Sequence, residues 1–216
     1  MDTACNMEPY KPYFVRAIEA HYPGRSTAIL AAIDKHYARL AEDTRFAAAS
    51  ANPLDKRLDF SAYFLALIQT LDERGESFQT IRSVCLQVVN EYVRPKNKLQ
   101  QLLKRLPAML IGTRPARVLL KVFAGKVGRR AHPDGFVARI ITDKAETLGL
   151  GYGFDILECG ICKLFHKHHY ARYASILCEV DEITSGFAGL ELVRTSTIAL
   201  GAHKCDFRFR KASQAE

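Results

Sequence analysis

The sequence has no tryptophan and no apolar run long enough to cross a membrane. A membrane-spanning helix needs about 20 consecutive apolar residues, and no stretch approaches that length. Residues 1–5 also lack the basic start and the apolar core of a secretion signal. We therefore expect a cytoplasmic protein that is neither exported nor inserted into a bilayer.

Cysteine is too sparse for a disulfide-stabilised scaffold, since the 216 residues contain only six. A reducing cytosol keeps such thiols free. Four of the six come late in the chain, at Cys159, Cys162, Cys178 and Cys205. Thiol chemistry or metal binding, if the protein has either, is therefore expected in this C-terminal part.

Acidic residues are missing from residues 94–132, a segment that holds 11 lysines and arginines. The rest of the chain has 20 basic and 23 acidic residues, so this segment accounts for the net charge of +8. Such regional charge predicts a local anionic contact, either a carboxylate ligand or an anionic membrane surface. The alternative is a solvated helix pair, 99–111 and 116–123, packed through its leucines. Nucleic-acid binding is not expected, because aromatic residues do not alternate with the basic ones.

The first 132 residues have the periodicity of amphipathic helices. Apolar residues recur every three or four positions in three stripes, at 29–40, 60–71 and 81–92. Gly75 is expected to end the second helix and Ser77 to cap the third. Cys85 lies within the third stripe and is expected in the core.

After residue 132 the pattern becomes that of strands alternating with helices. We expect strands at 136–143 and 152–159, helices at 161–169 and 173–187, and a hairpin of strands 190–199 and 204–210 joined through 200–203. The glycine-rich residues 149–153 precede a strand instead of opening a helix, which argues against a nucleotide-binding loop.

These elements predict one α+β domain over residues 1–216. A helical layer (1–132), which includes the basic segment 94–132, is expected to pack on the sheet-containing part (133–216). The sheet is expected to be small and mainly antiparallel, with about four strands and two helices inserted between the strand pairs.

Side chains alternate along the last predicted strand. Cys205 shares one face with Phe207 and Phe209, while Asp206 and Arg208 share the other. Cys205 is therefore expected to point toward the aromatic core of the protein.

Cys178 and Asp181 lie three residues apart on the preceding helix and so share a face of it. A thiol and a carboxylate brought together between this helix and the sheet can form a nucleophile with a polar partner, or can bind a metal. Spacing does not choose between these, and a buried thiol on each element is also an ordinary feature of a core.

A second cluster of potential ligands begins at Cys159 and Cys162 and continues through a histidine-rich stretch, 165–169. These residue types suit zinc. A closed site needs a second pair of ligands, so a zinc ion would draw on Cys159, Cys162, Cys178, Cys205 and His169.

Four short motifs in chain order resemble the L-2-amino-thiazoline-4-carboxylic acid hydrolase family. They are Phe-Asp-Ile-Leu-Glu-Cys at 154–159, Leu-Cys-Glu-Val-Asp at 177–181, Arg-Thr-Ser-Thr at 194–197 and Gly-Ala-His-Lys-Cys-Asp-Phe-Arg-Phe at 201–209. The terminal Cys-Asp-Phe-Arg-Phe is the most specific. The chain departs from the family pattern at Cys162 and in the histidine-rich stretch.

The resemblance implies a hydrolase that opens 2-amino-thiazoline-4-carboxylate to N-carbamoyl-L-cysteine on a bacterial route to cysteine, or that acts on a related cyclic amidine or thioether. Attack at the amidine-like carbon needs a nucleophile or activated water, a proton for the leaving group and a carboxylate clamp. No cofactor is expected, with zinc as the alternative. The expected partners are a small molecule with a carboxylate and, for a homo-oligomer, a second copy of the chain.

The motif positions imply roles for individual residues. Cys178 or Cys205 is the expected nucleophile, Asp181 positions or deprotonates the attacking group, and Cys159 completes the thiol cluster. The expected substrate-binding residues are Arg194, Thr197, Asp206 and Arg208. Arg194 is the preferred carboxylate clamp, because Arg208 is expected to face away from Cys205.

The main rival is a small-molecule-binding or sensor domain without catalysis. A helical first half followed by a small antiparallel sheet also resembles the 4-vinyl reductase-type and haem-nitric-oxide-type ligand domains. A bound chromophore would favour that alternative.

Overall fold

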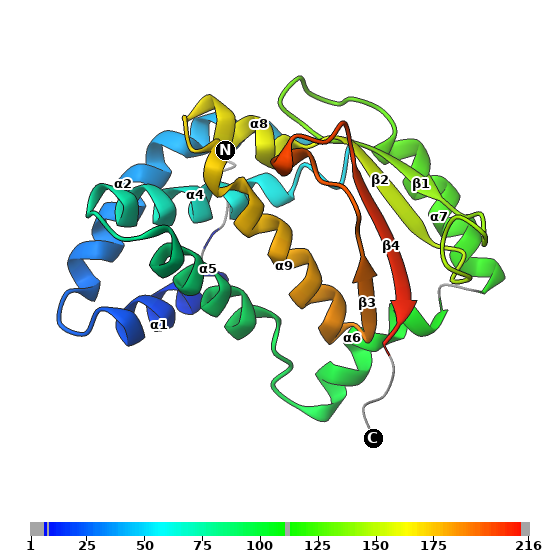
Figure 1. The fold of residues 1–216 in the computed structure, drawn as a ribbon, viewed down its shortest axis with the longest axis horizontal. Coiled ribbons are helices and arrows are strands. Elements are labelled where there is room, and N and C mark those ends of the chain that lie inside the picture. The colour runs from blue at the N-terminus through cyan, green and yellow to red at the C-terminus, as the bar shows by residue number, and fades with distance from the viewer. Residues whose placement is uncertain (1–6, 8, 111–112, 213–216) are drawn as a thin grey trace.

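The structure is a computed structural model that describes residue 7 and residues 9–110 and 113–212. A layer of helices lies beside a four-stranded sheet, and helix α9 (Ala174–Phe187) runs between the two (Figure 1). The predicted α+β class is therefore confirmed, and so is the helical N-terminal half.

The helical layer is built around α4. Every side chain from Ser61 to Ile68 is buried, so this helix is buried on all sides, although the sequence predicted a single apolar stripe. The predicted helix signals are confirmed: Gly75 follows α4 with φ +79°, and Ser77 caps α5 by accepting a hydrogen bond from the Thr80 amide. The helices of this layer are α1 (Lys11–His21), α2 (Ser26–Thr44), α3 (Phe46–Ala49), α4 (Arg57–Glu73) and α5 (Phe78–Val93).

Cys85 lies in this helical core, as predicted. Its side chain is fully buried on α5. Burial raises the pKa of the thiol far above that of an exposed cysteine. This thiol is therefore a packing group.

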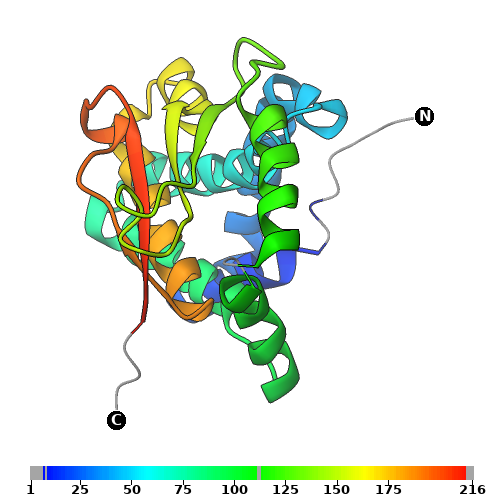
Figure 2. The same ribbon diagram turned by 90° about the vertical axis from the view of Figure 1, so that its right-hand side faces the viewer.

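The basic segment forms two helices, α6 (Lys98–Leu110) and α7 (Arg114–Val127). The second begins earlier than predicted, because Thr113 caps it by accepting a hydrogen bond from the Ala116 amide, and it also ends later, at Val127. Figure 2 shows α7 upright beside the sheet and α6 projecting from the lower end of the molecule.

All four strands of the sheet are antiparallel to their neighbours, in the order β1-β2-β4-β3. The strands are β1 (Val137–Ile141), β2 (Gly153–Glu158), β3 (Leu190–Val193) and β4 (Cys205–Lys211). Helices α8 (Gly160–Lys167) and α9 lie between β2 and β3 in the sequence, which confirms the two predicted insertions.

The predicted hairpin is wrong in its first strand, which ends at Val193 and not at residue 199. The carboxylate of Asp206 accepts hydrogen bonds from the backbone amides and the hydroxyls of Thr195 and Ser196. A side chain that binds these amides removes them from the strand ladder. The connection continues through a 3₁₀ turn, η2 (Ile198–Leu200), which Thr197 caps by accepting from the Ala199 amide.

The outer face of the sheet carries a charge cluster centred on Asp155, whose side chain is fully buried. Its Oδ2 lies 2.9 Å from Arg139 Nη2 and 2.8 Å from Lys204 Nζ, and its Oδ1 lies 3.0 Å from Arg208 Nη1. Burial alone would raise the pKa of Asp155, but hydrogen bonds from the three cations outweigh it and lower the pKa. The cluster ties β1, β2 and β4 together.

We expect Asp155→Asn to lower the free energy of unfolding at pH 7 by about 2 kcal/mol, less than a fully buried pair would lose because two of the cations are solvated. The folded pKa of Asp155 is depressed, so its stabilisation is present above the unfolded pKa of about 3.9 and is lost as the pH falls through the folded pKa. The difference in unfolding free energy between the wild type and the variant, measured with urea, should therefore be smaller at about pH 3 than at pH 7. The control is Glu191→Gln, which changes an exposed carboxylate on the same face of the sheet. An effect of Asp155→Asn that is equal at both pH values would contradict the charge explanation.

Candidate active site between α9 and the sheet

A cluster of thiols lies where α9 faces the sheet. Cys178 Sγ on α9 is 3.5 Å from the Thr197 hydroxyl, and Cys205 Sγ on β4 accepts a hydrogen bond of 3.2 Å from the Ile198 amide. Cys159, just before α8, is close enough to raise the pKa of both thiols through its charge. The structure thus brings together Cys159, Cys178 and Cys205, called the thiol cluster below, with Thr197 beside them.

The thiol cluster is protonated at neutral pH. Burial raises the pKa of Cys178 to about 11, although Thr197 and Arg194 act to lower it. Burial also raises the pKa of Cys205. A hydrogen bond with Cys162 and then burial raise the pKa of Cys159. Because the thiolate is the reactive form, each of these cysteines would need a base before it could attack a substrate.

Asp181 lies between two arginines that come from different layers. Arg57 Nη2, from the first turn of α4, is 3.4 Å from Oδ1, and Arg194 Nη1, just after β3, is 3.4 Å from Oδ2. Both distances exceed those of ordinary N–H···O hydrogen bonds. Burial raises the pKa of Asp181 even though both arginines act to lower it. A carboxyl group with a raised pKa and loose partners is suited to take up and return a proton.

Arg194 is held by several groups at once. Its side chain is only 8% exposed, and Nη2 donates to the Cys178 carbonyl at 3.0 Å and to Glu182 at 3.3 Å. Its guanidinium also lies 5.1 Å from the centre of the Phe207 ring. Arg194 therefore fixes the position of Asp181 against the sheet.

Asp181 and Arg57 line a cavity of about 750 Å³ between the helical layer and α9. The described lining residues include no cysteine, so the thiol cluster does not line this cavity. Aromatic and basic side chains complete the lining, among them Tyr10, Tyr13, Phe60, Tyr92, Lys56, Arg94, Lys96 and Lys104. No sequence signal pointed to Arg57, which is 124 residues from its partner Asp181.

Two predicted substrate-binding residues lie elsewhere. Asp206 and Arg208 are on the opposite face of β4 from Cys205, as the strand alternation predicted. Asp206 holds the loop after β3, and Arg208 contacts Asp155. Neither is brought to Asp181, so their prediction as substrate ligands gains no support from the geometry.

The five residues of the predicted zinc set do not converge on one point. Among the described residues there is no group of three or more histidine, cysteine or acidic side chains that could hold a metal ion. His169 is exposed at the turn after α8, whereas Cys205 is buried at the start of strand β4. Zinc binding stays a prediction.

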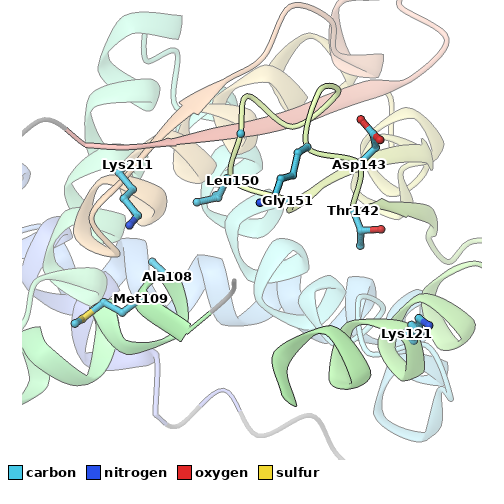
Figure 3. Close-up of a pocket in the computed structure, with 10 residues that line it drawn as sticks. Ala108, Met109, Lys121, Thr142, Asp143, Leu150, Gly151 and Lys211 are labelled. Carbon is cyan, nitrogen blue, oxygen red and sulfur yellow. The ribbon is translucent and has the colours of Figure 1, made fainter. Parts of the chain in front are cut away.

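A second cavity, of about 610 Å³, lies near the start of β2, beside the glycine-rich turn that precedes this strand. Figure 3 shows Lys121 and Lys211 on opposite sides of it, with Asp143 and Gly151 on the loop between β1 and β2. None of its described lining residues falls in the four sequence motifs. We therefore place the candidate site at Asp181.

A mostly buried carboxyl group between two arginines at the wall of a cavity is the kind of arrangement that marks a candidate site for small molecules. Residues 56–209 match the family model described as L-2-amino-thiazoline-4-carboxylic acid hydrolase, and the chain belongs to this family of hydrolases. The match runs from the start of α4 to β4 and so includes Arg57, Asp181 and Arg194. No curated protein and no solved structure is significantly similar to the chain. Among the described residues, no helix is long and apolar enough to span a membrane.

We expect iodoacetamide to modify the thiol cluster slowly at pH 7. A pKa of about 11 in place of 9.0 lowers the thiolate fraction of Cys178 by roughly 100-fold. Its rate should then rise about tenfold per pH unit, as peptide mass spectrometry can follow. Urea-unfolded protein, in which every thiol is accessible, is the control. Fast labelling of one clustered cysteine at pH 7 would instead identify a thiolate nucleophile.

Proposed function

We propose that the protein hydrolyses a small heterocycle that carries a carboxylate, such as 2-amino-thiazoline-4-carboxylate, with water that Asp181 activates. The observation that carries this proposal is the position of Asp181, which lines the cavity between Arg57 and Arg194 and has a raised pKa. The family description supports the substrate class.

The reaction can be balanced with Asp181 as the single proton carrier. Water adds to the amidine-like carbon between nitrogen and sulfur, and its proton passes to the Asp181 carboxylate. The ring nitrogen takes the electron pair of the C=N bond, and the hydroxyl proton of the tetrahedral carbon moves to this nitrogen as the carbonyl forms and the bond to sulfur breaks. Asp181 returns the proton to the departing sulfur, which gives the free thiol of N-carbamoyl-cysteine and restores the carboxylate.

Arg57 is the better clamp for the substrate carboxylate. Its side chain is 46% exposed, lines the cavity and has one long contact with Asp181. Arg194, the clamp expected from the sequence, is 8% exposed and already engaged. We assign Arg57 to the substrate and Arg194 to the positioning of Asp181.

Covalent catalysis by Cys178 is the second candidate mechanism. This thiol shares a face of α9 with Asp181 and contacts Thr197. Its raised pKa means that Asp181 would have to deprotonate it before attack. The two mechanisms therefore differ in whether the thiol itself is required.

Release of free thiol from 2-amino-thiazoline-4-carboxylate, followed with a thiol-specific dye, separates the two mechanisms. We expect Asp181→Asn to lower kcat by about 10³-fold, within the usual contribution of general acid–base catalysis. Cys178→Ser and Cys205→Ser should keep kcat within about tenfold of the wild type, since neither removes the base.

A comparable loss in Cys178→Ser would establish the covalent route instead. Wild-type protein without activity on this thiazoline or on related cyclic amidines and thioethers would contradict the proposed hydrolysis. Tight binding of such a compound without turnover would favour the ligand-binding alternative.

Arg57→Met should raise KM by about 10- to 100-fold, because the substrate carboxylate loses its charged partner. The substitution also removes a cation that lowers the pKa of Asp181. If the carboxylate form of Asp181 is the active one, the activity of the variant should therefore fall at a higher pH than that of the wild type as the solution is acidified. Lys96→Met, on the same cavity wall, is the matched control. An unchanged KM with an unchanged pH profile would remove Arg57 from the site.

A further inference from the structure

Exposed apolar side chains are concentrated on α6 and α7. Of the 14 large apolar residues that are exposed in the described chain, nine lie on these two helices. They are Leu99, Leu102, Leu103, Leu106, Met109 and Leu110 on α6, and Val118, Leu119 and Val122 on α7. These nine residues are called the apolar ridge below.

The ridge is a regular helical stripe that is exposed to solvent, and its members Leu106, Leu110 and Leu119 also border the cavity between these helices and the sheet. On α6 its members recur every three or four residues, which is the pattern that normally turns toward a protein interior. Leu99, Leu102 and Leu103 are instead 65%, 52% and 56% exposed. The alternative expected from the sequence, in which the leucines pack the pair together, is not what the structure has.

Basic side chains accompany the ridge without acidic partners. Lys98, Lys121 and Lys126 are exposed and make no ion pair within the described residues. The whole segment 94–132 contains no Asp or Glu that could neutralise them. The face therefore combines an apolar stripe with uncompensated positive charge.

The inner side of the two helices is also loosely filled. An apolar cavity of about 850 Å³ lies between them and the sheet, lined by Leu110, Phe123, Tyr152 and Phe209 among others. It shares Lys104 with the cavity that contains Asp181. Burial against the protein thus contributes little to holding α6 in place, and α6 projects from the body (Figure 2).

We propose that α6 and α7 dock the protein onto a bilayer with anionic headgroups. The ridge would enter the boundary between headgroups and acyl chains, and the lysines would contact the acidic headgroups. A second copy of the chain fits less well, because two faces of this kind would bring like charges together. A lipid surface offers an apolar layer and negative charge at once, which matches both features of the face.

Sedimentation with vesicles tests the proposal on the full chain. We expect binding to phosphatidylcholine vesicles that contain about one quarter phosphatidylserine, and at least about tenfold weaker binding to phosphatidylcholine alone. Raising the salt from about 0.1 M to about 0.5 M should release the protein, because exposed charges are screened.

Paired variants separate the two features of the face. Lys98→Glu with Lys121→Glu, and Leu102→Ser with Leu103→Ser, should each weaken binding at least about tenfold. Lys35→Glu on α2 and Leu200→Ser in η2, which is 77% exposed, are matched controls that should leave binding unchanged. Circular dichroism checks that every variant is folded.

The absence of binding to acidic vesicles at low salt would overturn the proposal, as would equal losses in the ridge variants and the controls. Light scattering tests the competing occupant. A dimer in solution that the Leu102→Ser and Leu103→Ser pair converts to a monomer would assign the face to a second copy of the chain. Thiazoline hydrolysis without lipid does not depend on these outcomes, so the catalytic proposal stands or falls separately.

Discussion

The arrangement depends on one constraint, which is that α9 must serve both layers. Its apolar residues Ile176 and Leu177 pack into the helical core, while its other side faces the sheet. The seam between the two layers is therefore where this helix can place a partly buried polar group. Asp181 lies in that seam, where Arg57 of the helical layer and Arg194 beside the sheet approach it from opposite sides. A buried carboxylate without these partners would cost free energy. The contacts of Asp181 with the two arginines therefore also hold the two layers together.

Burial has opposite consequences for the two kinds of reactive group in this seam. It disfavours the charged form of every acid, and so raises the pKa of Asp181 as well as the pKa values of Cys178 and Cys205. For a carboxyl group the change moves the pKa toward neutral pH, where a proton carrier works best. For a thiol it moves the pKa away from neutral pH. The same burial therefore favours Asp181 as the candidate proton carrier and disfavours the thiols as nucleophiles at neutral pH.

Local sequence patterns were sufficient to predict the elements of the site but not all its members. The spacing of Cys178 and Asp181 fixed their common face, and strand alternation fixed the side on which Cys205 lies, because both depend on backbone geometry alone. The short β3 was not predictable, since Asp206 competes for backbone amides only after the chain has folded. Arg57 was missed for a related reason. Its contact with Asp181 spans 124 residues, and nothing in its neighbourhood distinguishes it from other surface arginines.

The contrast between α4 and α6 shows what apolar periodicity leaves open. Both helices have apolar residues at helical spacing, yet α4 is buried on all sides and the stripe of α6 is exposed. Periodicity fixes which side chains share a face, and it says nothing about what lies opposite that face. Charge supplies the missing information here. A helix whose neighbourhood has only basic residues cannot be neutralised by its own segment, so the partner of its apolar face is most favourably one that brings negative charge. The lack of acidic residues in the segment 94–132 is therefore more informative about the partner of this apolar face than the exposed leucines are.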